Sequence, residues 1–102
     1  MNARGVGRLA GWIMAHRRSN IERNRWTVGL LDIQETDHVL EVGFGPGLAI
    51  EQVARLATKG RIVGIDHSAL MVEQARRRNR AAIEVGLVEL KLGGLELIAQ
   101  IR

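Results

Sequence analysis

The second two thirds of the chain alternates between short apolar runs and longer segments with apolar residues at helical spacing. The runs at 39–42, 61–66 and 87–92 predict three strands, because each is short and rich in Val, Ile or Leu. The intervening segments 48–58 and 68–85 carry apolar residues three and four positions apart, which predicts two helices. Alternating strands and helices indicate an α/β fold, and right-handed crossovers place the three parallel strands in the spatial order 3-2-1.

Two further helices are expected before this alternation begins. Apolar residues recur at helical spacing over 9–16, which predicts the first helix. Ser19 and Glu22 form a capping-box pattern, in which a hydroxyl and a carboxylate satisfy backbone amides at a helix start. The second helix should therefore begin there and end near Leu31.

A single domain accommodates all of these elements, because 102 residues leave room for one core of ordinary size. We divide it into N-terminal helices over 1–36, a β-α-β-α-β core over 37–94, and a tail over 95–102. The apolar pattern of the tail fits either a strand or a helix.

Composition excludes several kinds of site. The chain has no Cys, so it contains no disulfide framework and no cysteine-ligated metal, and its acidic and His residues show no metal-ligand spacing. Two Trp, one Phe and no Tyr do not form a stacking platform for single-stranded nucleic acid, which argues against a nucleic-acid partner. No apolar run reaches the roughly 18 residues that a membrane span needs, and we expect a cytoplasmic protein.

Positive charge gathers near the N-terminus. The net charge is +4, and residues 1–31 contain six Arg and one Glu. Such a segment is either a solvated helix face or a surface for an acidic partner, an anionic substrate or a membrane. A second cluster, Arg76–Arg78 with Arg80, has acidic neighbours and no interleaved aromatic residues, which predicts a solvated helix face.

Three glycines directly follow the first predicted strand: Gly43, Gly45 and Gly47. Glycines at this point let the backbone approach a ligand closely, with amides at the start of the next helix directed toward it. Asp66 ends the second predicted strand, where a carboxylate can accept both hydroxyls of a ribose. The combination predicts a site for a nucleoside cofactor. The alternative is a tight turn, with Asp66 capping the following helix.

The glycine spacing argues against a dinucleotide. The G-x-G-x-x-G fingerprint requires glycine at the position of Leu48, and Pro46 lacks an amide that a pyrophosphate could use. A nicotinamide-dependent oxidoreductase is therefore the weaker alternative.

The spacing E-x-G-x-G-x-G over 41–47 resembles motif I of the class I S-adenosylmethionine-dependent methyltransferases. The runs VLEVGFGPGLAIEQVA and GRIVGIDHSALMVEQA are similar to the first half of that family, and the resemblance covers about residues 20–92. It implies a partial Rossmann-like sheet of three strands, with crossover helices and two N-terminal helices. It also implies S-adenosylmethionine as the cofactor.

The resemblance implies a role for each residue of the site. Glu41 would hold the methionyl amino group, Asp66 would bind the ribose hydroxyls, and the glycine loop would line the methionyl and ribose portions. The expected cofactor-binding residues are Glu41, Gly43, Phe44, Gly45, Pro46, Gly47 and Asp66, with His67 and Met71 against the adenine. Asn20 and Trp26 are candidates for the wall of the pocket, which the two N-terminal helices would cover.

The pattern stops after the third strand. The family's fourth strand, which faces the methyl group and the acceptor, is absent from the sequence, and Gly93-Gly94 stand where a polar residue usually contacts the adenine. No His has an evident base partner, so we name no catalytic residue. We expect the cofactor-binding half of a methyltransferase, a single truncated domain. The alternative is a non-catalytic half-domain that binds S-adenosylmethionine or S-adenosylhomocysteine and acts through oligomerisation.

A homodimer, or a second chain that completes the site, is the expected protein partner. In the order 3-2-1 the strand at 39–42 has an open outer edge. The strand at 61–66 is apolar on both faces, with Val63 and Ile65 on one and Ile62 and Gly64 on the other. Because both crossover helices lie on one face, the other face should be bare. Both features would favour pairing with another chain.

Overall fold

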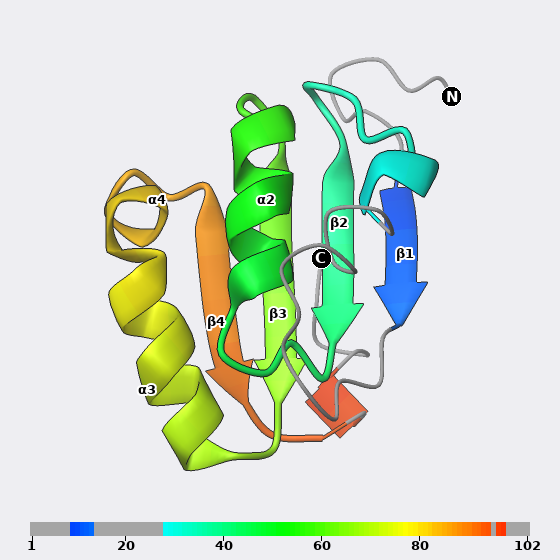
Figure 1. Cartoon of the computed structure of the whole chain (residues 1–102). Coiled ribbons are helices and arrows are strands. Elements are labelled where there is room, and N and C mark those ends of the chain that lie inside the picture. Colours follow the sequence, from blue (N-terminus) through cyan, green and yellow to red (C-terminus); the bar gives the residue numbers. More distant parts are fainter. Residues whose placement is uncertain (1–8, 14–27, 95, 98–102) are drawn as a thin grey trace.

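Four parallel strands form the centre of the molecule in a computed structural model that describes residues 9–13, 28–94 and 96–97 (Figure 1). The elements are β1 (Leu9–Ile13), β2 (His38–Val42), α2 (Leu48–Leu56), β3 (Arg61–Asp66), α3 (Ala69–Arg78), α4 (Arg80–Glu84) and β4 (Val88–Leu92). Within the described residues, no helix is long and apolar enough to cross a membrane.

The three strands predicted from the apolar runs are confirmed as β2, β3 and β4. They are adjacent and parallel, in the order that the crossover rule predicts. The register pairs Val39 with Ile62 and Ile62 with Val88, which places these three side chains on the same face of the sheet. The fold class, α/β with a partial Rossmann-like sheet, is therefore correct.

The helix predicted over 9–16 is wrong for residues 9–13, which form β1. This strand pairs in parallel with β2 along its whole length, from Leu9 opposite His38 to Ile13 opposite Val42. The run LAGWI has helical spacing, but it is too short for periodicity to separate a helix from a buried strand, and Gly11 weakens a helix. Pairing with β2 satisfies the backbone groups on one side of the run, so tertiary context overrides the local spacing.

The second N-terminal helix and the tail fall largely outside the described residues. Residues 28–30 are helical, which agrees with a helix ending near Leu31. Ser19, Glu22 and the wall candidates Asn20 and Trp26 lie outside the described residues.

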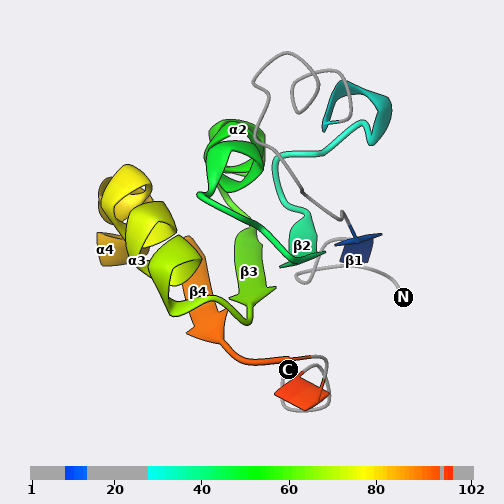
Figure 2. The same cartoon turned by 60° about the horizontal axis from the view of Figure 1, so that its bottom comes forward.

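Helices α2, α3 and α4 lie together on one side of the sheet (Figure 2). Their buried side chains meet the strands in a single apolar core. This core includes Val39, Ala49, Ile50, Val53, Ile62, Val72, Ala75, Val88 and Leu90. The layer of helices thus covers the face that Val39 and Ile62 occupy, and it leaves the carboxyl ends of the strands at one edge of the molecule.

The opposite face of the sheet is not bare. Val63 and Ile65, which point away from the helices, are only 4% and 1% exposed. Toward β4 this face becomes charged, with Glu89 paired to Arg61 and, at 3.2 Å, to Lys91. The two expectations from which a dimer was predicted are therefore wrong. β1 pairs with the edge of β2 that was expected to be open, and the apolar part of the far face is buried.

The single helix predicted over 68–85 is divided into α3 and α4 at Asn79. The backbone of Asn79 has φ −110° and ψ 24°, outside the helical range. Its side-chain amide donates to the carbonyl oxygens of Ala75 and Gly47. Asn favours such local hydrogen bonds over a continuous helix, which explains the break.

Candidate functional site

The loop from Gly43 to Gly47 joins β2 to α2 at the carboxyl edge of the sheet, next to the end of β3. In parallel α/β sheets, ligands bind outside this edge, because the loops and helix starts converge there. The Gly43 amide donates to the Ile65 carbonyl oxygen at 2.7 Å, which fixes the beginning of the loop against β3.

Each of the three glycines adopts a conformation that other residues avoid. Gly43, Gly45 and Gly47 have φ angles of 75°, 60° and 90°. In this left-handed region a Cβ atom is sterically unfavourable. The glycines thus form a left-handed loop between β2 and α2, where the sequence analysis expects it, and this geometry is common to a cofactor loop and to the alternative of a tight turn.

The Asp66 carboxylate joins the loop to the start of α3. Asp66 is 6% exposed, and its Oδ2 accepts a hydrogen bond from the Gly45 amide at 2.9 Å. Its Oδ1 accepts from the Ser68 amide, also at 2.9 Å. Because a carboxylate oxygen has two lone-pair directions, each oxygen can accept a further donor, such as a ribose hydroxyl. This arrangement fits the nucleoside cofactor that the sequence predicts.

The alternative role considered for Asp66 is to cap α3, but in the structure Ser68 caps this helix. The Ser68 hydroxyl accepts from the Met71 amide at 3.2 Å and is the N-cap of α3. Asp66 accepts a hydrogen bond from the Ser68 amide, which precedes α3. Asp66 therefore stabilises the connection between β3 and α3 and does not cap the helix itself.

Glu41 lies in β2, two residues before the glycine loop. Its side chain is fully buried, on the sheet face that the helices cover. A carboxylate is costly to bury, so Glu41 is an unusual residue at this position. Val39, the preceding residue of β2 on the same face, is apolar. Its place, beneath the start of the loop, agrees with the position expected for a contact to the methionyl end of the cofactor.

Two of the expected cofactor residues face the protein interior. Phe44 is buried, and a Cβ built on Gly64 would lie 2.7 Å from its ring, so the ring packs directly over β3. A Cβ on Gly47 would lie 2.7 Å from the Cβ of Ala75 in α3. The Phe44 side chain therefore packs in the interior, and Ala75 occupies the space where a side chain of residue 47 would lie. Only the backbone at these two positions can face a ligand.

His67 and Met71, the residues expected against the adenine, follow Asp66 at the start of α3. His67 is exposed, with its Nδ1 3.9 Å from Asp66 Oδ1. Met71 is half-buried in the first turn of α3. The structure thus brings Asp66 against the glycine loop, which also contains half-buried Pro46, and places His67 next to Asp66.

Asn79 is a polar residue of this region that the sequence analysis did not select. It is 4% exposed and donates from Nδ2 to the Gly47 carbonyl oxygen at 3.2 Å, 32 residues earlier in the chain. An Asn inside an apolar helical pattern was the available signal, because Asn is a poor residue for a helix interior.

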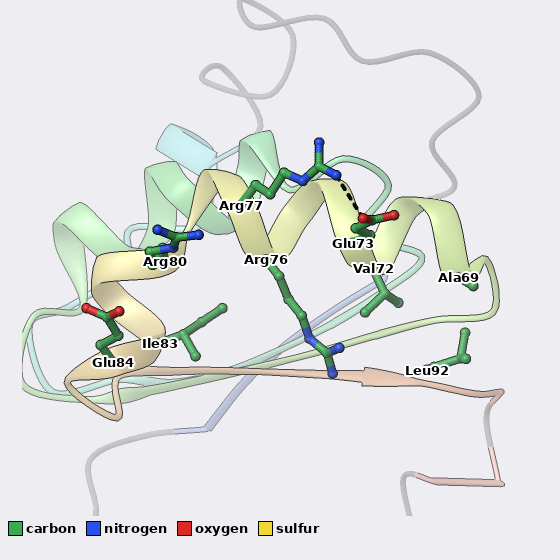
Figure 3. A pocket seen from close by; sticks show the side chains of 9 residues that line it. All are labelled: Ala69, Val72, Glu73, Arg76, Arg77, Arg80, Ile83, Glu84 and Leu92. Carbon is green, nitrogen blue, oxygen red and sulfur yellow. Dashed lines mark hydrogen bonds and ion pairs between the residues drawn. The ribbon is translucent and has the colours of Figure 1, made fainter.

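Three arginines of the cluster, Arg76, Arg77 and Arg80, line a separate groove of about 450 Å³ between β4 and the helices α3 and α4 (Figure 3). The fourth, Arg78, lies 3.8 Å from Glu51 of α2. Arg77 pairs with Glu73 at 2.8 Å, and Arg76 reaches the Leu90 carbonyl oxygen at 3.4 Å. All four arginines of the cluster are exposed, which agrees with the predicted solvated helix face. Among the described residues, no group of His, Cys, Asp or Glu could hold a metal ion.

Comparison with known proteins identifies one family. A family model described as a methyltransferase domain matches residues 39–99, which include β2, the glycine loop, Asp66 and β4. The match covers more than half of the chain.

Three relatives carry methyltransferase names. The uncharacterized methyltransferase YdaC of Bacillus subtilis is 40% identical over 70 residues, 69% of this chain. The demethylmenaquinone methyltransferase of Symbiobacterium thermophilum is 40% identical over 58 residues, 56% of this chain. The trans-aconitate 2-methyltransferase of Paracidovorax citrulli is 39% identical over 70 residues, 66% of this chain. The aligned segments span 38%, 23% and 27% of these three proteins, respectively.

Proposed function

The chain belongs to the methyltransferase domain family, and from this premise we propose that it binds S-adenosylmethionine at the carboxyl edge of its sheet. The observation that supports this most is the Asp66 carboxylate, which holds the Gly45 amide and keeps acceptor capacity for ribose hydroxyls. In this proposal the chain is the cofactor-binding half of a cytoplasmic methyltransferase.

Each expected residue then has a role that agrees with its position. Asp66 accepts the ribose hydroxyls, and Glu41, buried below the loop, orients the methionyl amino group. The backbone of Gly43–Gly47 lines the cofactor, while Phe44 and Gly47 support the loop from inside. His67 and Met71 lie against the adenine, beside the start of α3.

S-adenosylmethionine supplies an electrophilic methyl group on its sulfonium centre, and transfer depends largely on positioning the acceptor against it. The described residues hold and orient the cofactor. The aligned segment spans 38% of YdaC. In this proposal, residues that correspond to the unaligned part of such relatives form the acceptor site and supply any base that deprotonates the acceptor.

The second candidate is a half-domain that binds the cofactor without catalysis and acts with a second copy or a complementing chain. A methyl-transfer assay of the purified chain with labelled S-adenosylmethionine and heat-inactivated cell extract separates the two: label transferred to an acceptor only when the chain is present excludes a purely binding role.

Calorimetric titration with S-adenosylhomocysteine and with NAD tests the cofactor. We expect S-adenosylhomocysteine to bind and NAD to bind more weakly, because Leu48 and Pro46 replace the glycine and the amide that a pyrophosphate requires. Adenosine alone is the control for the nucleoside portion. Tighter binding of NAD would contradict the assignment.

A further inference from the structure

The glycine loop is held from two sides by the segment that runs from the end of β3 to the end of α3. At one end of this segment, Asp66 accepts the Gly45 amide at 2.9 Å. At its other end, Asn79 donates to the Gly47 carbonyl oxygen at 3.2 Å. Both contacts are buried, and they lie two residues apart in the loop.

The Asn79 contact is specific in its chemistry. The side-chain amide has two hydrogens, and Nδ2 donates to two acceptors, the Gly47 and Ala75 carbonyl oxygens, at 3.2 and 3.0 Å. The same Gly47 oxygen also accepts from the Glu51 amide within the first turn of α2. Asn79 therefore connects the last turn of α3 to the residue at which α2 begins.

Packing at Gly47 makes this connection rigid. A Cβ at Gly47 would lie 2.7 Å from the Ala75 Cβ and 2.8 Å from Asn79 Nδ2. Gly47 adopts φ 90° and gives α2 no side-chain cap. Because no side-chain cap holds Gly47, its contacts with Ala75 and Asn79 of the α3 segment fix its position in addition to the backbone bonds of α2.

We propose that Asn79 is a positioning residue for the cofactor loop. By holding the Gly47 carbonyl, it fixes the loop between Gly45 and α2 in the conformation that binds the adenosyl cofactor, without touching the cofactor itself. This inference rests on the proposed function. It predicts that loss of the amide weakens cofactor binding more than the accompanying loss of stability explains.

The test compares Asn79→Ala with Val88→Ala. Val88 is buried at the start of β4, at the end of the sheet opposite the loop, so its truncation reduces stability without contact to the site. We expect Asn79→Ala to bind S-adenosylhomocysteine about three- to tenfold more weakly than the wild type, the effect of losing about one hydrogen bond. Val88→Ala should keep the wild-type dissociation constant, although its melting temperature falls.

A second measurement reports on the loop without ligand. In ¹H–¹⁵N spectra of the free protein, the Gly45 and Gly47 amide resonances should shift in Asn79→Ala and stay in place in Val88→Ala. If Asn79→Ala does not fold, Asn79→Ser takes its place, because Ser is a favourable residue at a helix start and lacks the two amide hydrogens.

The outcomes separate this inference from the proposed function. A wild-type chain that binds no S-adenosylhomocysteine overturns the proposed function, while shifted loop resonances would still support the structural role of Asn79. Normal wild-type binding, with an unchanged dissociation constant and unchanged loop resonances in Asn79→Ala, overturns the positioning role.

Discussion

At Asp66, one carboxylate accepts backbone amides from the glycine loop and from the turn before α3. The same carboxylate is the proposed acceptor for ribose hydroxyls, so its removal has two separable effects. One is loss of order in the free loop, and the other is loss of direct contact with the cofactor.

Substitution of Asp66 should therefore weaken cofactor binding and also reduce stability. Asp66→Ala removes hydrogen bonds to a charged group, each worth about 1.5–3 kcal/mol, and we expect binding of S-adenosylhomocysteine to weaken by at least that amount. Calorimetry measures the binding and thermal unfolding measures the stability. Asp66→Asn, which keeps the shape and one acceptor oxygen, should fall between Asp66→Ala and the wild type.

Glu73→Gln is the matched control for this change. Glu73 is an exposed acidic residue on α3 that pairs with Arg77 and has no contact with the loop. Its substitution removes one negative charge from the same helix region and should leave binding unchanged. Equal weakening by Glu73→Gln and Asp66→Ala would point to a general effect of charge and would contradict the ribose contact.

At the scale of the elements, β1 alters the interpretation of the sheet. It pairs with β2 on the side away from β3, so β2 lies inside the sheet although the predicted order 3-2-1 placed it at an edge. An interior strand exposes no row of unpaired backbone groups, so β2 cannot itself pair with another chain, and the edge of the sheet lies at β1 instead.

Removal of β1 should allow β2 to pair in this way. A chain that starts at Met14 exposes the edge of β2 along His38–Val42. We expect a lower melting temperature and a higher mass by light scattering, because the freed edge pairs with a second copy. A chain that lacks only residues 1–8 keeps β1 and is the control. Identical behaviour of the two shortened chains would show that β1 does not protect β2.

At the scale of the whole molecule, the paired edge and the buried far face remove the reasons for an obligatory dimer. Val63 and Ile65 are buried, and the remaining part of this face carries the ion pairs of Glu89. In the described sheet, β1 and β4 are the two edge strands. On β4, Arg76 donates to one outward carbonyl group, that of Leu90.

We therefore expect the isolated chain to be a monomer. Light scattering coupled to gel filtration at micromolar concentration should give the mass of one chain, 11.3 kDa. A mass of twice that value would mean that the molecule associates through another surface. If Arg76→Ala but not Arg77→Ala then raised the mass further, that surface would include the edge of β4.

The sequence by itself determined the parts of this protein that depend on local pattern. Apolar runs and helical spacing located β2, β3, β4 and α2, and the glycine spacing located the loop that meets Asp66. These predictions hold because a left-handed turn requires glycine, and because parallel strands bring their carboxyl ends to one edge.

Only the tertiary structure decided which surfaces those elements meet. Residues 9–13 have helical spacing, yet they form a strand because β2 offers them a backbone partner. Phe44 and Gly47 belong to the loop in sequence, but packing against Gly64 and Ala75 turns them inward. Asn79 acquires its role from Gly47, 32 residues away. Periodicity reports which face of an element is apolar, whereas the partner that covers the face is set by contacts distant in sequence.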